Sequence, residues 1–303
     1  MFKNSFDNKR YYTFNYYLKT KFKNKVIKIP IDTSFGCPNK SKCIYCREFS
    51  KSNIINSNDN LIKQFNDNVI LLEKKWPDSL YIVYFQAGTN TYCSVETLKQ
   101  LIEPFLKLPK VVGVSIATRP DAISDDMLDY LEELNKQTFL TVELGLQSSN
   151  DKTLSFIKRG HDSNTFQNMV KKLKEKNIFV VAHIINNLPY ETEEDMLNTI
   201  KFLNKLEIDG LKIHMLFINK DTEIAKIYQK EKFKILTKDE YIDIVIKQLE
   251  ILNDNIVIER ITGDPIKEEL IEPKWLLKKF VVLNDIDKEM KKRDTWQGKY
   301  CQK

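Results

Sequence analysis

The chain has 303 residues, of which 42% are hydrophobic and 30% are charged, and its formal net charge is +6. This balance supports a large buried core, so it excludes a disordered chain or a collagen-like repeat. No stretch approaches the roughly 20 consecutive apolar residues of a membrane-spanning helix, and residues 1–7 lack the hydrophobic region of an export signal. We therefore expect a cytoplasmic protein with no membrane partner.

The first 30 residues are basic and rich in aromatic side chains. They carry eight Lys or Arg residues against a single acid, Asp7. Cations attract a polyanion and aromatic rings stack on unpaired bases, so contact with RNA is one interpretation. A solvated basic helix whose aromatic residues pack on the core is the alternative. The aromatic residues are Phe2, Phe6, Tyr11, Tyr12, Phe14, Tyr16, Tyr17 and Phe22.

From residue 26 onward, short β-branched runs alternate with longer segments of helical periodicity. Strands are predicted at Val26–Ile31, Leu80–Phe85, Val111–Ile116, Leu140–Leu144, Phe179–Ile184 and Gly210–Leu216. Helices are predicted at about 60–75, 95–107, 124–135, 164–176 and 191–205. Strands separated by helices pair in parallel with right-handed crossovers, and ligands then bind beyond the carboxyl ends of the strands.

The alternation weakens after about residue 220. A helix near 238–253 and a strand at Ile256–Ile261 precede a mixed, highly charged tail. We therefore expect a basic aromatic segment at 1–25, a core at 26–220, and an extension packed on the core at 221–303.

Three of the five cysteines, Cys37, Cys43 and Cys46, form a C-x5-C-x2-C loop directly after the first predicted strand. Thiolates at this spacing can surround one metal centre. A structural zinc site needs a fourth protein ligand, and every histidine lies more than 100 residues away. Cys93 or Cys301 could supply that ligand. Three cysteines on a four-iron cluster would instead leave one iron free for a substrate or cofactor.

Together with this loop, a series of short motifs resembles the radical S-adenosylmethionine (SAM) superfamily, in its YhcC/YtqA-type branch close to the elongator and coproporphyrinogen-oxidase-like cores. The motifs, in chain order, are Arg10-Tyr11-Tyr12, Phe35-Gly36-Cys37-Pro38-Asn39, Phe85-Gln86-Ala87-Gly88-Thr89-Asn90-Thr91-Tyr92, Thr118-Arg119-Pro120-Asp121, Glu143-Leu144-Gly145-Leu146-Gln147-Ser148, Arg159-Gly160-His161, Asp209-Gly210-Leu211-Lys212-Ile213-His214, Thr262-Gly263-Asp264 and Asp294-Thr295-Trp296-Gln297-Gly298.

This resemblance implies an α/β fold, a partial (β/α)6 TIM-like barrel with a C-terminal α/β extension. It implies a 4Fe-4S cluster on Cys37, Cys43 and Cys46 and a one-electron donor such as flavodoxin or ferredoxin. Reductive cleavage of SAM at the cluster would give a 5′-deoxyadenosyl radical that abstracts a hydrogen atom. The side chains expected to contact SAM are Gln86, Gly88, Thr118, Glu143, Gln147, Arg159 and His183.

Several of these residues have a structural alternative. Gly88 could only relieve a turn, and Arg159 could cap a helix before Gly160. Glu143 could pair with Arg119 instead of SAM, and His183 could be a core histidine.

Two segments depart from the pattern of the resemblance. Residues 186–191 lack the glycines usual in the family, and the spacing after Cys37 is shorter than usual in this branch.

The resemblance favours a radical SAM enzyme that modifies the wobble uridine of tRNA, contacted through Lys, Arg and aromatic residues of 1–30. A radical SAM enzyme acting on a small metabolite is the first alternative. A non-catalytic metal-binding protein that binds RNA is the second.

Overall fold

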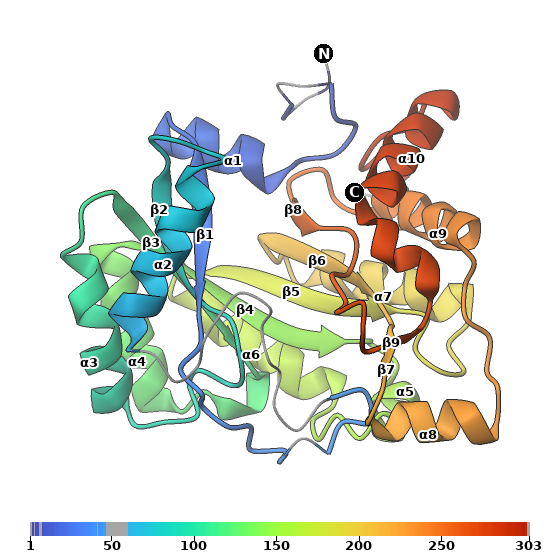
Figure 1. Cartoon of the computed structure of the whole chain (residues 1–303), viewed down its shortest axis with the longest axis horizontal. Helices are drawn as coiled ribbons and strands as arrows, with labels where there is room; N and C mark the ends of the chain where they lie inside the picture. The colour runs from blue at the N-terminus through green and yellow to red at the C-terminus, as the bar shows by residue number, and fades with distance from the viewer. Residues whose placement is uncertain (1, 3, 6–7, 41, 47–59, 302–303) are drawn as a thin grey trace.

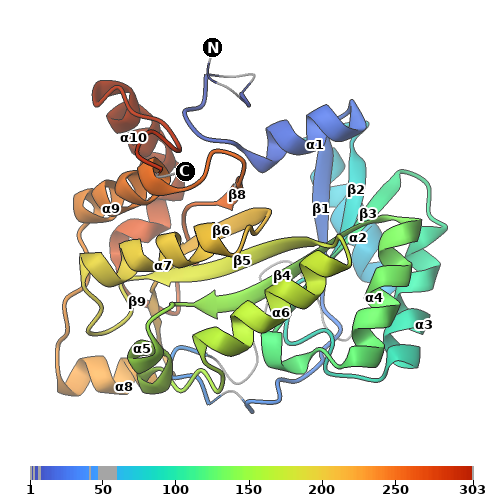
Figure 2. The same cartoon turned by 180° about the vertical axis from the view of Figure 1, so that it is seen from behind.

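The computed structural model describes residues 2, 4–5, 8–40, 42–46 and 60–301. Seven strands form one parallel sheet in the order β1-β2-β3-β4-β5-β6-β8. The sheet curls into a half-barrel whose outer face is covered by helices (Figures 1 and 2). The strands are β1 Val26–Ile31, β2 Leu80–Phe85, β3 Val111–Thr118, β4 Phe139–Gln147, β5 Phe179–Asn186, β6 Gly210–Met215 and β8 Val257–Arg260. A separate antiparallel pair joins β7 Ile218–Asn219 to β9 Leu270–Glu272.

All the α-helices except the last begin where a Ser, Thr, Asp or Asn side chain accepts the hydrogen bond of an unpaired amide, whereas the last begins after Lys278 with no such cap. Thr192 and Thr237, for example, each form a reciprocal capping box with an acid three residues later. The helices are α1 Phe14–Phe22, α2 Leu61–Glu73, α3 Val95–Leu106, α4 Asp125–Gln137, α5 Asp151–Phe156, α6 Ser163–Glu175, α7 Glu193–Lys205, α8 Glu223–Lys230, α9 Lys238–Ile251 and α10 Lys279–Lys292. Within the described part of the chain, no helix is both long and apolar enough to cross a membrane.

The predicted α/β fold, a partial TIM-like barrel, is confirmed, and β1 to β6 lie at the predicted places. The strand expected at Ile256–Ile261 forms as β8 and pairs with β6, so the extension contributes a seventh strand to the sheet. The predicted division of the chain at residue 220 stays a prediction. The helices α5, α8 and α10 were not predicted.

The basic N-terminal segment packs against the end of the barrel where the strands begin. The ring of Tyr17 on α1 lies 5.2 Å from that of Phe179 and 6.1 Å from that of Phe139. Leu18 of the same helix is buried with Val26 and Ile82. These aromatic residues pack on the core, as the alternative interpretation expects, while the RNA contact stays a prediction. Lys3, Phe6 and Asp7 lie outside the described residues.

Candidate functional site

The cysteine loop connects β1 to α2, at the end of the sheet where the strands finish (Figure 1). Cys43 is buried, and Cys37 and Cys46 are partly exposed. The amide of Lys40 donates to the Cys37 carbonyl at 2.8 Å, and the amide of Cys46 donates to the Cys43 carbonyl at 2.9 Å. The loop is therefore folded into consecutive tight turns around its thiols.

Ile44, between the second and third cysteines, anchors this loop. Its amide donates to the Ile157 carbonyl at 3.1 Å, and its carbonyl accepts from the Ile224 amide at 2.8 Å. Its side chain is buried among Leu154, Leu188 and other apolar residues. The loop is thus joined both to the residue after α5 and to α8 in the C-terminal part of the chain.

The Asn39 side chain links the cysteine loop to the segment that follows α5 by hydrogen bonds. Its amide group donates to the Cys43 Sγ at 3.2 Å and to the Lys158 carbonyl at 2.8 Å. Gly160 has a φ of +84°, and a Cβ there would lie 2.7 Å from the Asn39 Oδ1. A glycine is needed at this position because any side chain would push Asn39 away from the thiol.

The Cys43 and Cys46 side chains form a hydrogen-bonded pair. This bond lowers the pKa of Cys43 to about 5 against the effect of burial, and the positive charge of Arg159 assists. The same bond raises the pKa of Cys46. The pair therefore favours one thiolate, the form in which a cysteine binds a metal.

Arg159 and Gln147 meet above Gly145, close to Cys43. The Arg159 Nη2 donates to the Gly145 carbonyl at 2.7 Å, and its Nη1 lies 4.0 Å from the Cys43 Sγ. A Cβ on Gly145 would lie 2.6 Å from both Arg159 Nη2 and Gln147 Nε2. The Arg159 Nε is buried without a hydrogen-bond partner. Arg159 and Gln147, two of the residues predicted to contact SAM, are therefore adjacent, and the Arg159 Nε is an unused donor.

Gly88 packs the loop after β2 against the cysteine loop. Its φ is +73°, and a Cβ there would lie 2.1 Å from the Phe35 carbonyl oxygen. The next amide, of Thr89, donates to the Gly36 carbonyl at 3.2 Å. The close approach shown here is between two backbone segments, and a ligand contact at Gly88 stays a prediction. Gln86 lies at the end of β2 with its side chain exposed.

Thr118 and Arg119 lie at the end of β3. The Thr118 hydroxyl is 2.6 Å from that of Thr91. Arg119 donates two hydrogen bonds to Asp121, at 2.8 and 2.7 Å, and one to the Arg159 carbonyl at 2.9 Å. Arg119 thus pairs with Asp121 and supports Arg159, so the proposed alternative of an Arg119–Glu143 salt bridge is wrong.

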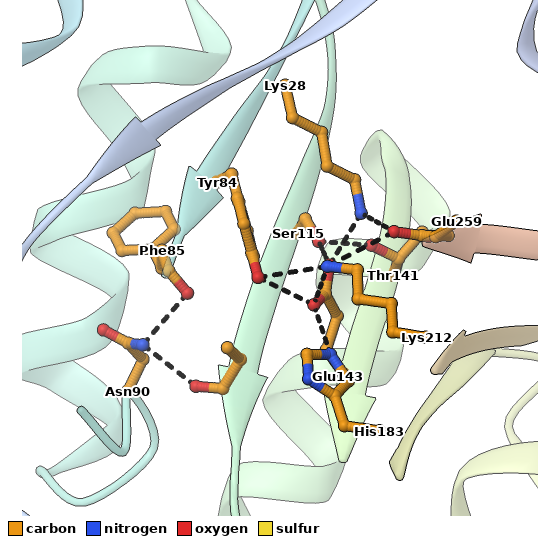
Figure 3. A network of polar contacts seen from close by, with 11 residues as sticks. Lys28, Tyr84, Phe85, Asn90, Ser115, Thr141, Glu143, His183, Lys212 and Glu259 are labelled. Atoms are coloured by element: carbon orange, nitrogen blue, oxygen red, sulfur yellow. Dashed lines mark hydrogen bonds and ion pairs between the residues drawn. The ribbon is translucent and has the colours of Figure 1, made fainter. Parts of the chain in front are cut away.

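Glu143 lies at the centre of a polar network inside the half-barrel (Figure 3). Its side chain is fully buried, and it accepts hydrogen bonds from five side chains of five different strands. Burial alone would raise the pKa of Glu143, but the ammonium groups of Lys212 and Lys28 hold it well below its ordinary value. The donors are Lys28, Tyr84, Ser115, His183 and Lys212.

The His183 Nε2 donates to Glu143 at 2.7 Å, and the ring stacks on His214 at a centroid distance of 5.2 Å. Burial lowers the pKa of both imidazoles, so both are uncharged at neutral pH. His183 is therefore a member of the network, and its contact with SAM stays a prediction.

Two sequence profiles match this chain. The profile of the Radical SAM superfamily matches residues 31–203, and that of the Radical SAM C-terminal domain matches residues 208–292. This chain belongs to the radical SAM superfamily. It is accordingly an enzyme whose cofactors are a 4Fe-4S cluster and SAM.

Relatives agree with this assignment. YtqA of Bacillus subtilis (strain 168) is 43% identical over 302 residues, which cover 97% of this chain and 94% of YtqA. A tRNA uridine(34) acetyltransferase of Methanocaldococcus infernus is 26% identical over 139 residues, 45% of this chain and 26% of that protein. The solved structure of Elp3 from the same archaeon, lacking residues 1–46, superposes with a TM-score of 0.70 at 20% identity. That match covers 90% of this chain and 64% of the Elp3 chain, and it shows a shared fold.

The residues of the cysteine loop fit the cluster of a radical SAM enzyme. Among the described residues, no three His, Cys, Asp or Glu side chains are arranged to hold a single metal ion. A four-iron cluster is larger than an ion, so its thiolate ligands stand around it rather than converge on one point. Cys37, Cys43 and Cys46 supply three soft ligands, and the lowered pKa of Cys43 favours ligation.

Some residues that build this radical SAM site were missed by the sequence analysis. Lys28, Lys212 and Glu259 form the charged interior with Glu143. Asn90 is fully buried, and its amide donates to the Phe85, Ala87 and Ala117 carbonyls at 2.9–3.0 Å, which joins the ends of β2 and β3 (Figure 3). A charged side chain inside an otherwise apolar strand, such as Lys212 in β6, is the sequence signal that could have found these residues.

Proposed function

We propose that this protein uses radical SAM chemistry in the cytoplasm to modify the wobble uridine of tRNA. The observation that carries the proposal is the similarity to a tRNA uridine(34) acetyltransferase, in a chain with the Elp3 fold. The excess of Lys and Arg in segment 1–30 supports an RNA substrate. Free thiols in the cysteine loop fit a reducing compartment.

In this proposal, Cys37, Cys43 and Cys46 would hold the cluster through three thiolates. The bound cluster supplies the electron for reductive cleavage of SAM to a 5′-deoxyadenosyl radical. Arg159 binds the carboxylate of SAM, for which a guanidinium is suited because it offers parallel donors. Gln147 hydrogen-bonds the ribose.

The remaining predicted contacts line the same end of the sheet. Gln86 and Gly88 follow β2, Thr118 ends β3, and Glu143 and His183 lie deeper in the half-barrel. Glu143 acts through the network, because both of its oxygens already have partners, and the Nε2 of His183 is hydrogen-bonded to Glu143.

The first test is anaerobic reconstitution of the wild type, of Cys43→Ala, and of Cys93→Ala as a thiol control outside the loop. We expect about four irons per wild-type chain, and 5′-deoxyadenosine on addition of SAM and dithionite. Cys43→Ala should lose both, and Cys93→Ala should keep both. Iron and 5′-deoxyadenosine that survive in Cys43→Ala would contradict the proposed ligand set.

The substrate is tested on the nucleosides of tRNA from cells with and without the protein. We expect one modified wobble uridine to be replaced by its precursor when the protein is removed. An unchanged nucleoside profile, with 5′-deoxyadenosine formation stimulated by a small metabolite, would favour the small-metabolite alternative instead.

A further inference from the structure

The net positive charge of this chain comes from its two ends. Residues 1–30 carry a net charge of +7, and residues 274–303 carry nine basic and four acidic side chains, a net charge of +5. Because the whole chain has a net charge of +6, the intervening 243 residues carry −6. The basic ends are therefore not part of a general surplus of lysine.

The fold brings these two ends together. The Gln297 amide donates to the Arg10 carbonyl at 2.8 Å, and the Gln297 side chain accepts from the Tyr12 amide at 2.8 Å. The rings of Phe2 and Trp296 lie 6.3 Å apart. Both views show α1 and α10 at the same end of the molecule, opposite the cysteine loop (Figures 1 and 2). We call the surface formed by residues 8–23 and 278–301 the terminal face.

Contacts within and beside the terminal face neutralise the acids of α10 and its C-terminal end. Asp287 pairs with Lys9, and Asp294 with Arg10 at 3.0 Å. Glu289 pairs with Arg293 at 2.9 Å and with Lys292 at 3.4 Å, and Asp285 pairs with Lys238 from α9. The exposed lysines of the face therefore set its potential. They include Lys21, Lys23, Lys278, Lys291 and Lys292.

Exposed aromatic residues lie among these cations. Phe280 and Tyr300 are 65% and 58% exposed, and Trp296 is 39% exposed. The Lys299 ammonium lies 5.1 Å from the ring of Trp296 and 5.4 Å from that of Tyr300. A cleft of about 310 Å³ runs between α1 and α10 and is lined by Phe14, Arg260 and Lys279 among others.

We propose that the terminal face binds the body of the tRNA substrate, a proposal that rests on the proposed function. Exposed lysines attract phosphates, and exposed rings beside them stack on unpaired bases. An acidic protein would be attracted by the same charge but would leave the aromatic rings unexplained. The face lies opposite the cysteine loop. The part of the tRNA that binds to it would therefore be distant in space from the nucleotide that reacts.

The experiment measures the affinity of the cluster-loaded enzyme for a full-length tRNA with a wobble uridine, at several salt concentrations. One variant carries Lys291→Glu and Lys292→Glu on α10. A second carries Lys21→Glu and Lys23→Glu at the end of α1. A control with the same change of charge carries Lys99→Glu and Lys136→Glu on α3 and α4, away from the face.

Each terminal-face variant should bind tRNA at least tenfold more weakly, with the salt dependence of log K reduced by about two. Formation of 5′-deoxyadenosine without RNA should be unchanged, and so should the thermal stability. The control should bind as the wild type does.

Wild-type affinity in both terminal-face variants, or an equal loss in the control, would overturn the proposal and leave the proposed function standing. Retained tRNA affinity with turnover lost only when flavodoxin replaces dithionite would mean that the face binds the electron donor. A wild type that neither binds nor modifies tRNA would refute the proposed function, and this proposal with it.

Discussion

Arg159 connects the cysteine loop to β4, the strand that carries Glu143 and Gln147. One of its nitrogens holds the Gly145 carbonyl, another lies near the Cys43 thiol, and Nε has no partner. A buried guanidinium with an unused donor is unfavourable unless a ligand completes it. This distinguishes Arg159 from a helix cap, the alternative drawn from the sequence.

Replacement of Arg159 should therefore weaken SAM binding. Charged hydrogen bonds contribute about 1.5–3 kcal/mol, so Arg159→Ala should raise the Kd for SAM by roughly 10- to 100-fold. Arg159→Lys keeps the charge without the forked geometry and should give an intermediate value. Anaerobic titration calorimetry measures the affinity, with iron content as the control for the cluster. Unchanged affinity in Arg159→Ala would remove this residue from the SAM site.

Glu191, in the loop after β5, should make stability depend on pH. Burial and the nearby Asp195 raise the pKa of Glu191 from 4.5 to about 7. The folded protein therefore holds this proton more tightly than the unfolded chain does. The resulting stabilisation is complete below about pH 4.5 and is lost as the pH rises through 7.

Urea unfolding at several pH values should show this difference between the wild type and Glu191→Gln. Relative to the variant, the wild type should lose up to about 1.4 kcal/mol of unfolding free energy per pH unit between pH 5 and 7. Parallel pH profiles for the two proteins would show that Glu191 is ionised in the folded state.

At the scale of elements, the loop after β2 and the cysteine loop are packed backbone to backbone at Gly88. Gly88→Ala would place a Cβ 2.1 Å from the Phe35 carbonyl oxygen at a φ of +73°. We expect a loss of about 1–3 kcal/mol of stability and a lower iron content, because the cysteine loop must shift. Gly36→Ala is the matched control, since nothing lies within 4 Å of a Cβ there. Equal iron content in the two variants would show that the loops are not coupled.

Elements of simple periodicity were predictable from the sequence, and those set by distant contacts were not. The run Val26–Ile31 is β-branched and became β1 at the predicted bounds. In α10, the buried residues Val282, Ile286 and Met290 are spaced by four but stand among charges, so the helix was read as a charged tail. Glu143 was singled out, but its partners on β1 and β6 depend on how the sheet curls.

At the scale of the whole molecule, one ion pair joins the two edges of the half-barrel. Lys28 on β1 lies 2.6 Å from Glu259 on β8 and 2.6 Å from Glu143 on the central strand β4. Lys28→Met would leave two buried carboxylates with Lys212 as their remaining ammonium partner in the network. Removing one partner of a buried ion pair lowers the free energy of unfolding by about 3–5 kcal/mol.

The double variant Lys28→Met/Glu259→Leu should recover most of this loss, because an apolar pair replaces the ionic one without leaving a charge unpaired. Urea unfolding of the wild type, both single variants and the double variant completes the cycle. Additive losses in the double variant would show that Lys28 and Glu259 do not stabilise each other.

The anchoring of Ile44 has a consequence for biosynthesis. This residue leaves the ribosome early, yet its backbone carbonyl is satisfied by Ile224, which is translated 180 residues later. At about 5–20 residues per second, the nascent loop waits roughly 10 to 40 seconds for that partner. Insertion of iron and sulfide by the assembly machinery is therefore expected after translation of the C-terminal part, and a ribosome-stalled fragment ending before residue 224 should remain without a cluster.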